Sequence, residues 1–343
     1  MTAETLGVGD RRWDELVAAA PEPDVYYRPG YCAAYEAAGH GQVVAVATEH
    51  ALWPLLLRPL PFGETGRDAA TPYGYGGLLP TGPDAATATD LEQLRDWCVA
   101  NDVVSVLVRL HPLLGGPAQV AGLAGWDGLE VRDFGPTVAV DPRRIDAETG
   151  RLAGMSKGRK ADLTIARREL ELTWGTGEEP LETFRGIYDA TMQRLGAGEF
   201  YLFPREYYRS LADGLGDNLA LALTLRGGEP VGGALFLADP DGRFAHYHLS
   251  GTSDSGRELK AGTLLVHAGA EWAAQRGAER FHLGGGTSGA DSLFAFKKSF
   301  GGEQLAYGFV TLVADARRYE TLVARRSEEP EPPRPGFFPA YRA

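Results

Sequence analysis

The sequence is poor in the features that mark several common classes of protein. It has two cysteines in 343 residues, Cys32 and Cys98, and they lack the paired spacing of metal ligands. No apolar run is long enough to span a membrane, because the segment 51–58 is interrupted by Pro54 and ends in a charge. Residues 1–16 lack the basic segment and apolar core of a signal peptide. We therefore expect a cytoplasmic protein with no membrane span and, in that reducing compartment, no disulfide.

Lysine is scarce and unevenly placed. None precedes Lys157, after which Arg159, Lys160, Arg167 and Arg168 crowd one segment. The net charge of −12 argues against a long nucleic-acid-binding surface, and so against DNA as a partner, although it allows a small basic site. The basic segment is typical of a solvated helix face, and the alternative is a contact with an anionic ligand.

Several motifs of catalysis are also missing. The sequence has neither a Gly-x-Ser-x-Gly elbow nor a Walker loop, which counts against the hydrolases and NTPases that use them. His246 and His248 alternate in a predicted strand and so share one face. Two such residues could hold a metal, but no third ligand has a convincing spacing, so polar packing is favoured. We predict neither a metal nor a cofactor.

Glycines and lysines come together near the end of the chain, in residues 281–302. An apolar strand end runs into three glycines (284–286), which allow positive φ angles and the close approach of a ligand. A helix predicted from Asp291 has an apolar side that leaves Lys297 and Lys298 near its edge. An ammonium there could stabilise an oxyanion, and the alternative is a solvated surface helix.

Hydrophobic periodicity divides the chain into two α/β units with a boundary near residues 141–150. The first domain is expected over residues 1–142, the second over 151–320, and an extended Pro-rich tail over 327–343. In the first domain we predict helices at 11–20, after Pro29 and from a capping box at 89–92, and strands at 42–48, 51–59, 103–109 and 131–140.

The second domain has the clearer order of elements. A helix is predicted after an N-cap at Ser156. Further elements are predicted as helices at 181–195, 205–215 and 261–275, and strands at 219–225, 230–237, 243–250, 280–283 and 306–313, with hairpin turns at 226–229 and 239–242. Helices, an antiparallel meander, a helix and a returning strand follow the order of an N-acetyltransferase.

A known family is similar to this chain. The series Leu283-Gly-Gly-Gly, Phe296-Lys297 and Ser299-Phe300-Gly301-Gly302 resembles the end of the second domain of Fem-like transferases. These belong to the GNAT superfamily and include aminoacyltransferases that build peptidoglycan bridges. The resemblance extends from Arg159 to Gly302 and more loosely through the first half. It implies an α/β (α+β) fold of two tandem GNAT-like domains with mixed, mainly antiparallel sheets.

The resemblance also implies a reaction, in which an acceptor amine attacks an activated ester or thioester without a covalent enzyme intermediate. Lys297 matches the lysine of the family's Phe-Lys motif, which is associated with the tetrahedral oxyanion, so it is the expected catalytic residue. The residues expected by the same likeness to bind substrate are Phe296, Tyr247, Ser250, Tyr207, Tyr208, Tyr73 and Tyr75. For the loop that holds Tyr73 and Tyr75, packing within the loop is the favoured alternative. Asp254 and Asp291 could act as general bases, but each also fits a turn or cap.

The donor site is expected at two places. The family's basic helix corresponds to the segment with Arg159, Lys160, Arg167 and Arg168. The second place is a predicted helix start with Arg257, Gly262 and Thr263, where free N–H groups could dock an anion. Superfamily members bind the coenzyme A pyrophosphate there through an Arg/Gln-x-x-Gly-x-Gly/Ala signal. This sequence keeps only one of those glycines, and a helix start without a ligand is the alternative.

The acceptor is expected to be small. Family members that build peptidoglycan tend to use a first-domain lysine for their nucleotide-linked substrate, and this first domain has none. The leading hypothesis is an aminoacyltransferase that takes an amino acid from the acceptor end of aminoacyl-tRNA and forms an amide with a small-molecule amine. The alternatives are an N-acyltransferase that uses acyl-coenzyme A and a non-catalytic member that binds a ligand without turnover.

Overall fold

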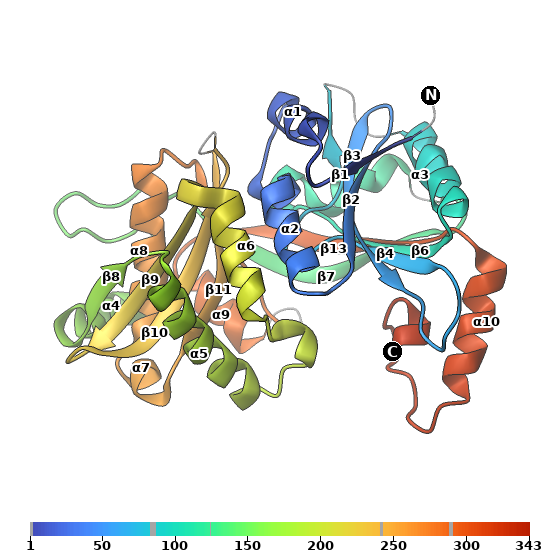
Figure 1. The fold of residues 1–343 in the computed structure, drawn as a ribbon. Helices are drawn as coiled ribbons and strands as arrows, with labels where there is room; N and C mark the ends of the chain where they lie inside the picture. The colour runs from blue at the N-terminus through green and yellow to red at the C-terminus, as the bar shows by residue number, and fades with distance from the viewer. Residues whose placement is uncertain (1–2, 83–86, 124, 241–242, 288–290) are drawn as a thin grey trace. The chain divides into compact units, whose positions relative to one another are not determined.

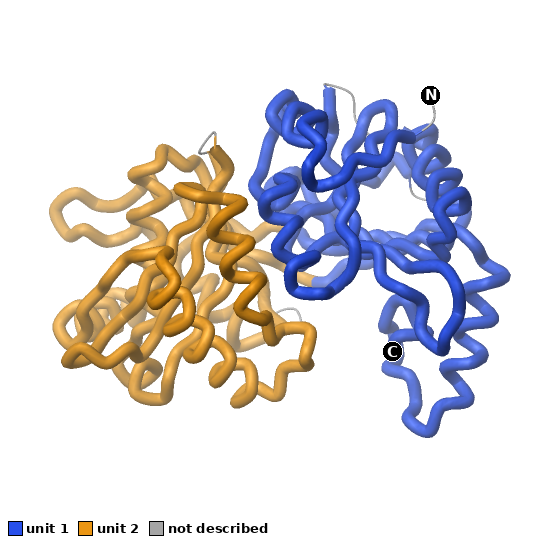
Figure 2. Tube along the Cα trace, viewed as in Figure 1, with its two compact units in different colours: residues 1–134, 306–343 blue, residues 135–305 orange. Residues whose placement is uncertain are grey.

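The computed structural model describes residues 3–82, 87–123, 125–240, 243–287 and 291–343. The chain forms two compact units (Figure 2). Unit 1 comprises residues 1–134 and 306–343, and unit 2 comprises residues 135–305. The chain passes from one unit to the other inside two strands, β7 (Leu129–Val140) and β13 (Glu303–Val313). Among the described residues, no helix combines the length and apolar character that crossing a membrane requires.

Unit 1 is a sheet with strand order β1-β2-β3-β4-β6-β13 and helices packed on it (Figure 1). Its elements are β1 (Glu4–Gly7), α1 (Arg11–Ala19), η1 (Val25–Tyr27), α2 (Pro29–Ala37), β2 (Gln42–Ala47), β3 (Ala51–Pro59), β4 (Arg67–Ala70), β5 (Leu79–Pro80), α3 (Ala88–Ala100), β6 (Val103–Arg109), η2 (Pro112–Leu114), η3 (Gly116–Leu123), the start of β7, most of β13, α10 (Ala316–Ser327) and η6 (Ala340–Arg342). The core beneath α3 includes Leu91, Leu94 and Cys98, as the periodicity predicts.

The end of the chain returns to unit 1, which differs from the expected domain boundaries. β13 pairs antiparallel with β6, with Phe309 opposite Arg109, so residues 306–313 complete the first sheet instead of the second. The segment 327–343 is not extended throughout: Tyr341 in η6 is buried, and its hydroxyl lies 2.8 Å from the Ser105 hydroxyl. A buried aromatic side chain with a satisfied hydroxyl anchors this segment, which Pro-rich composition alone does not reveal.

Unit 2 contains the strands and helices in the order of an N-acetyltransferase. Its elements are the end of β7, α4 (Lys157–Glu169), β8 (Glu171–Trp174), α5 (Glu178–Arg194), η4 (Glu199–Tyr201), α6 (Arg205–Leu215), η5 (Gly216–Asn218), β9 (Leu219–Arg226), β10 (Glu229–Ala238), β11 (Phe244–Thr252), α7 (Asp254–Glu258), α8 (Ala261–Gln275), β12 (Arg280–Gly285), α9 (Ser292–Lys298) and the start of β13. The sheet order is β7-β12-β11-β10-β9-β8, antiparallel except where β11 and β12 run parallel.

Helices cover both faces of this second sheet. A Cβ added to Gly232 in β10 would meet Ala261 of α8, whereas one added to the next residue, Gly233, would meet Phe184 of α5. Because successive strand residues point to opposite faces, α5 and α8 lie on opposite sides. A core cluster of the unit joins α4 and α8 to the sheet and includes Leu163, Leu265 and Phe236.

Local signals place most of these elements correctly. Ser156 caps α4, with its hydroxyl accepting from the Arg159 N–H at 3.3 Å. The capping box of α3 lies two residues earlier than predicted, because the Asp90 carboxylate accepts from the Thr87 N–H at 2.8 Å. The turn at 226–229 joins β9 to β10 as expected, and the turn at 239–242 lies partly outside the described residues.

Candidate functional site

Two neighbouring strands of unit 2 separate after a short pairing. β11 and β12 are paired in parallel at three positions, the last of which joins His246 to His282. Within the described residues of both strands no pairing follows, although β11 continues to Thr252 and β12 to Gly285. The facing backbone groups beyond His246 are therefore free of ladder hydrogen bonds to each other, and they lie at the carboxyl ends of two parallel strands.

A β-bulge prepares β11 for this separation. Leu235 of β10 faces Leu249 and Phe236 faces Tyr247, so His248 is the extra residue. An extra residue reverses the alternation of side chains that follow it. Tyr247 and Ser250, three residues apart, therefore share a face and are hydrogen-bonded through their side chains. Burial raises the pKa of Tyr247 to about 12, so the phenol is neutral at physiological pH.

Lys297 reaches the end of the neighbouring strand. It lies in the last turn of α9, and its Nζ donates a hydrogen bond of 2.7 Å to the carbonyl oxygen of Gly285. Burial lowers the pKa of Lys297 to about 8, with the nearby Asp291 carboxylate opposing the change. The carbonyl of Gly285 is the only hydrogen-bond partner of Nζ within the described part of the chain, so two of the three N–H donors of the ammonium remain for a ligand.

Glycine is required beside this contact. Gly284 has a φ of +76°, and the pairing of β12 with β7 shifts by one residue between His282 and Gly284. The backbone conformation favours a residue without a Cβ. The positive φ agrees with what the glycine-rich sequence predicts, and the carbonyl of the next residue, Gly285, accepts from Lys297. The following residues 288–290 of the same motif lie outside the described residues.

One arginine, Arg159, contacts both the start of α8 and the helix α9. Arg159 Nη1 donates to the Thr263 hydroxyl at 2.9 Å and pairs with Asp162 at 2.9 Å. The Arg159 guanidinium carbon also lies 4.8 Å from the centre of the Phe296 ring. A Cβ added to Gly262 would meet the same ring at 3.7 Å. Three residues expected to bind the donor, Arg159, Gly262 and Thr263, therefore lie near Phe296, one position before Lys297.

The first turn of α8 is suited to an anion. Its N-cap residue, Lys260, has a φ of +65° and no side chain caps the helix. Uncapped N–H groups and the positive end of the helix dipole favour negative charge. Arg257 lies one turn before, where it pairs with Asp254 at 2.8 Å on the surface. The start of α8, expected from Gly262 and Thr263, therefore has a geometry that favours an anion.

All five lysines of the chain stand on three helix ends that meet. Ser156, before α4, donates from its N–H to the Ser299 carbonyl after α9 at 2.9 Å, and Arg159 joins α4 to α8. The lysines are Lys157 and Lys160 in the first turn of α4, Lys260 before α8, and Lys297 and Lys298 at the end of α9. The sequence shows that no lysine precedes Lys157, but it does not predict that these three helix ends meet.

The other residues of the basic helix make local ion pairs. Arg167 lies 3.3 Å from Glu271 of α8 and also donates to the Gly150 carbonyl at 3.0 Å. Arg168 is exposed and pairs with its neighbour Glu169 at 2.7 Å. Lys160 is exposed. Within the basic segment, Arg159 therefore contacts α8 and α9, whereas Arg167 pairs with α8 and Arg168 stays at the surface.

Tyr207 and Tyr208 of α6 lie in the core on the α5 side. The Tyr207 hydroxyl lies 2.9 Å from Nε2 of His248, the bulged residue, and its ring stacks on Phe203 at 4.2 Å. Burial lowers the pKa of His248 to about 3, and the neighbouring His246 adds to the effect. No local sequence signal indicates that Tyr207 secures the bulge, because the contact joins residues 41 positions apart.

The two candidate general bases have structural roles. Asp291 caps α9, with Oδ1 accepting from the Phe294 N–H at 2.9 Å and Oδ2 accepting from Thr287. Asp254 lies at the start of α7 and pairs with Arg257. These contacts match the turn and cap roles that the sequence also allowed.

Unit 1 holds Tyr73 and Tyr75 in a cluster of aromatic residues. The Tyr75 ring lies 5.7 Å from Tyr26 and 5.1 Å from Tyr307, and the Tyr73 carbonyl accepts from the Tyr31 hydroxyl. The rings pack edge to face, an arrangement that stabilises a core. Loop packing, the alternative that the sequence favoured, therefore describes what this part of the structure shows.

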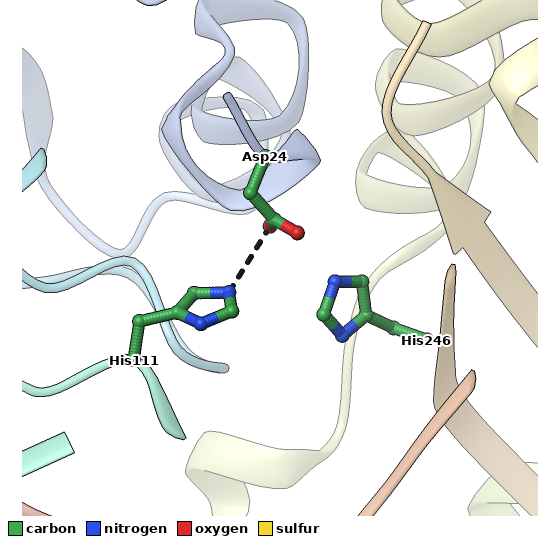
Figure 3. Close-up of side chains that lie close together, drawn as sticks. All are labelled: Asp24, His111 and His246. Carbon is green, nitrogen blue, oxygen red and sulfur yellow. Dashed lines mark ion pairs between the residues drawn. The ribbon is translucent and has the colours of Figure 1, made fainter. Parts of the chain in front are cut away.

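A buried ion pair lies beside these rings. Nε2 of His111 is 3.4 Å from Oδ1 of Asp24, and both side chains are fully buried (Figure 3). The His111 ring stacks with Tyr27 at 5.9 Å. His246, which Figure 3 also labels, belongs to β11 of unit 2, where its ring lies 5.7 Å from that of His282.

Known proteins share this fold. Residues 156–298 match the family of acetyltransferase (GNAT) domains. The crystal structure of FemX is 15% identical, with a TM-score of 0.66 over 93% of this chain and 99% of that chain. L-PGS from Bacillus licheniformis is 13% identical (TM-score 0.58, 93% and 97% covered). A tandem GNAT protein from the clavulanic acid biosynthesis pathway is 14% identical (TM-score 0.54, 91% and 98%). No curated protein matches the sequence significantly.

The GNAT acetyltransferase domain over residues 156–298 makes this protein an acyltransferase. The domain covers the separation of β11 and β12, the start of α8 and Lys297. Over nearly its full length the chain has the Fem-like tandem GNAT fold, which confirms the fold class predicted from the sequence.

Proposed function

We propose that the protein is an aminoacyltransferase that transfers an amino acid from aminoacyl-tRNA to the amine of a small molecule and so forms an amide. The observation that carries the proposal is the Lys297 ammonium, which Gly285 fixes where β11 and β12 separate. The two N–H donors left on Nζ can bind the oxyanion that forms when an amine attacks the ester. No covalent intermediate is required, because the enzyme needs only to position both substrates and stabilise the charge.

The helix meeting point supports a donor rich in phosphate. Lys157, Lys160, Lys260 and Lys298 form no ion pair within the described residues, although the chain carries a net charge of −12. Concentrated unpaired cations on an acidic protein favour a polyanionic ligand. The Fem-like resemblance indicates the acceptor end of tRNA. Because the donor is itself a substrate, the proposed reaction uses no cofactor. We propose that the protein acts in the cytoplasm, where charged tRNA is available.

The proposed acceptor is a small amine and not a nucleotide-linked cell-wall precursor. Unit 1 contains no lysine that could hold a diphosphate. We assign catalysis to unit 2 and propose that Tyr247 and Ser250, which share a face beside the separated strands, bind the reacting groups.

An acyl-coenzyme A donor is the second candidate. The observation that favours it is the uncapped start of α8 with Lys260 in a left-handed conformation, a geometry that suits one pyrophosphate. It concerns the first turn of α8 alone, whereas the tRNA proposal uses the lysines of all three helix ends.

Equilibrium binding to charged tRNA, uncharged tRNA and acetyl-coenzyme A separates the two candidates. We expect preference for charged tRNA. The double variant Lys157→Glu, Lys160→Glu should weaken tRNA binding. The slope of the logarithm of the binding constant against the logarithm of the salt concentration should become less steep by about 0.7 for each phosphate that is no longer neutralised. Arg168→Glu is the matched control, because Arg168 is exposed on the same helix and paired with Glu169. Tight coenzyme A binding without tRNA binding would replace the first candidate by the second.

Catalysis is tested at Lys297. Single-turnover transfer from the donor that binds should be lost in Lys297→Ala with binding retained, since the ammonium acts on the transition state. Lys298→Ala, the exposed neighbour, should weaken donor binding but keep the single-turnover rate at saturating donor. An unchanged rate in Lys297→Ala would remove the assignment, and retained binding without turnover in the wild type would favour a non-catalytic member.

A further inference from the structure

Arg159 is bound within the protein and is not presented to a ligand. Its Nη1 serves two acceptors at 2.9 Å each, the Thr263 hydroxyl and the Asp162 carboxylate. Its guanidinium carbon lies 4.8 Å from the centre of the Phe296 ring, and its side chain is 24% exposed. An arginine that recognises phosphate presents its planar edge of N–H donors, and here part of that edge is already committed.

The ring that Arg159 contacts belongs to a helix too short to hold its own position. α9 spans seven residues, Ser292–Lys298, and a helix of two turns is not stable without packing. Phe294 of α9 is buried in the core, and Phe296 makes a second contact, with the Arg159 guanidinium over its ring, Phe300 at 5.3 Å and the backbone of Gly262 beside it. The rotation of α9 about its buried anchor therefore depends on how Phe296 is held.

Lys297 follows Phe296 directly, so the same packing sets where its ammonium lies. On a helix, neighbouring residues point about a quarter turn apart, and fixing one fixes the direction of the next. Within the described residues Nζ reaches a single carbonyl, that of Gly285, at 2.7 Å. A small rotation of α9 would break this contact and release the ammonium to water.

We propose that Arg159 is a positioning residue that ties the first turn of α8 to Phe296 and thereby holds Lys297 against the Gly285 carbonyl. The inference rests on the proposed role of Lys297 and assigns Arg159 to positioning instead of to donor binding. It also links the anion-binding start of α8 to the catalytic lysine through three side chains, Thr263, Arg159 and Phe296.

The test uses NMR of the full chain with isotopically labelled lysine, and needs no acyl donor. Five lysines give five side-chain signals, which single substitutions assign. The pKa of Lys297 should be about 8 in the wild type. In Arg159→Met and in Arg159→Lys it should rise towards the 10.5 of an ordinary lysine, because a displaced ammonium regains water. The side-chain signals of Lys260 and Lys298 should keep their wild-type chemical shifts at neutral pH.

The lysine substitution separates position from charge. Arg159→Lys keeps the positive charge but loses the planar fork, so a purely electrostatic influence would leave the titration of Lys297 unchanged in it and would overturn the proposal. Thr263→Val removes one acceptor without changing charge and should give a smaller rise, which keeps the test available if Arg159→Met fails to fold. Arg168→Met is the control on the same helix and should change nothing.

The two proposals can fail independently. If Lys297→Ala abolishes transfer but the Arg159 variants leave the Lys297 titration unchanged, the reaction stands and the positioning role is wrong. If the titration shifts as expected but Lys297→Ala transfers normally, Arg159 positions a lysine that the reaction does not use.

Discussion

Replacing Lys297 by methionine should make the protein more stable at neutral pH. The folded protein holds this ammonium with a pKa of about 8, against 10.5 for an ordinary lysine. At pH 7 that difference corresponds to about 3 kcal/mol of destabilisation by the buried charge. Methionine has a similar length and no charge, but it leaves the Gly285 carbonyl without a donor, which costs about 1 kcal/mol. The expected gain in the free energy of unfolding is therefore about 2 kcal/mol.

The effect should depend on pH in a defined direction. Between about pH 8 and 10.5 the unfolded chain binds more protons at residue 297 than the folded protein does, so wild-type stability rises with pH. The advantage of Lys297→Met should therefore shrink across this window and become a deficit of about 1 kcal/mol near pH 10.5, where only the lost hydrogen bond remains.

Urea unfolding followed by circular dichroism at pH 7 and pH 10.5 measures this difference. Lys298→Met is the matched control, because Lys298 is exposed and should change stability by no more than about 0.5 kcal/mol at either pH. A Lys297→Met variant that is less stable than the wild type at pH 7, or whose difference from it is the same at both pH values, would refute the burial of the ammonium.

Three further predictions concern the frame of the two units. The pKa of His248 is about 3 in the folded protein and 6.5 in an ordinary histidine, so the unfolded chain binds a proton there first as the pH falls below 6.5. Between pH 7 and pH 5 the free energy of unfolding of the wild type should therefore fall by about 2 kcal/mol more than that of His248→Gln, as measured by urea unfolding. Gly301→Ala should lower the free energy of unfolding by about 3 kcal/mol, because φ is +84° and the new Cβ would strike the Gly154 backbone. The control Gly277→Ala, with a φ of +75° and open space around the new Cβ, should lower it by about 1 kcal/mol. Equal losses in the two variants would contradict the contact with Gly154. Tyr341→Ala should lower the stability of unit 1 by about 3 kcal/mol in thermal melts, and an unchanged melting temperature would contradict the packing of the C-terminal segment.

Helices and strands with a clear pattern in their own residues were predicted from the sequence. α6 runs from Arg205 to Leu215 as expected, because its apolar residues follow a helical period and a proline precedes it. β8 was missed, because its alternation of polar and apolar residues spans only four positions, which are mostly exposed at the edge of the sheet. The return of β13 to unit 1 could not be read from the sequence, because the pairing partner of a strand is a property of topology and not of its own composition.

The site was predictable in its parts but not in its arrangement. The Phe-Lys motif led to Lys297, and glycines led to the turn at Gly284. In a regular strand Tyr247 and Ser250 would point to opposite faces, and only the bulge at His248 brings them together. The register shift that forms the bulge depends on the partner strand, which the sequence of β11 does not encode alone.

The choice of lysine at position 297 is itself informative, because the chain has 29 arginines and five lysines. A guanidinium is a planar fork that stays charged, whereas an ammonium is a compact charge with three donors whose pKa responds to burial. One donor satisfies Gly285 and two remain for an oxyanion. Lys297→Arg keeps the positive charge, but a guanidinium cannot donate to both the Gly285 carbonyl and the oxyanion from the position of Nζ. Transfer should therefore be lost although donor binding is retained. Full activity in this variant would show that any positive charge suffices and that the geometry at Gly285 is incidental.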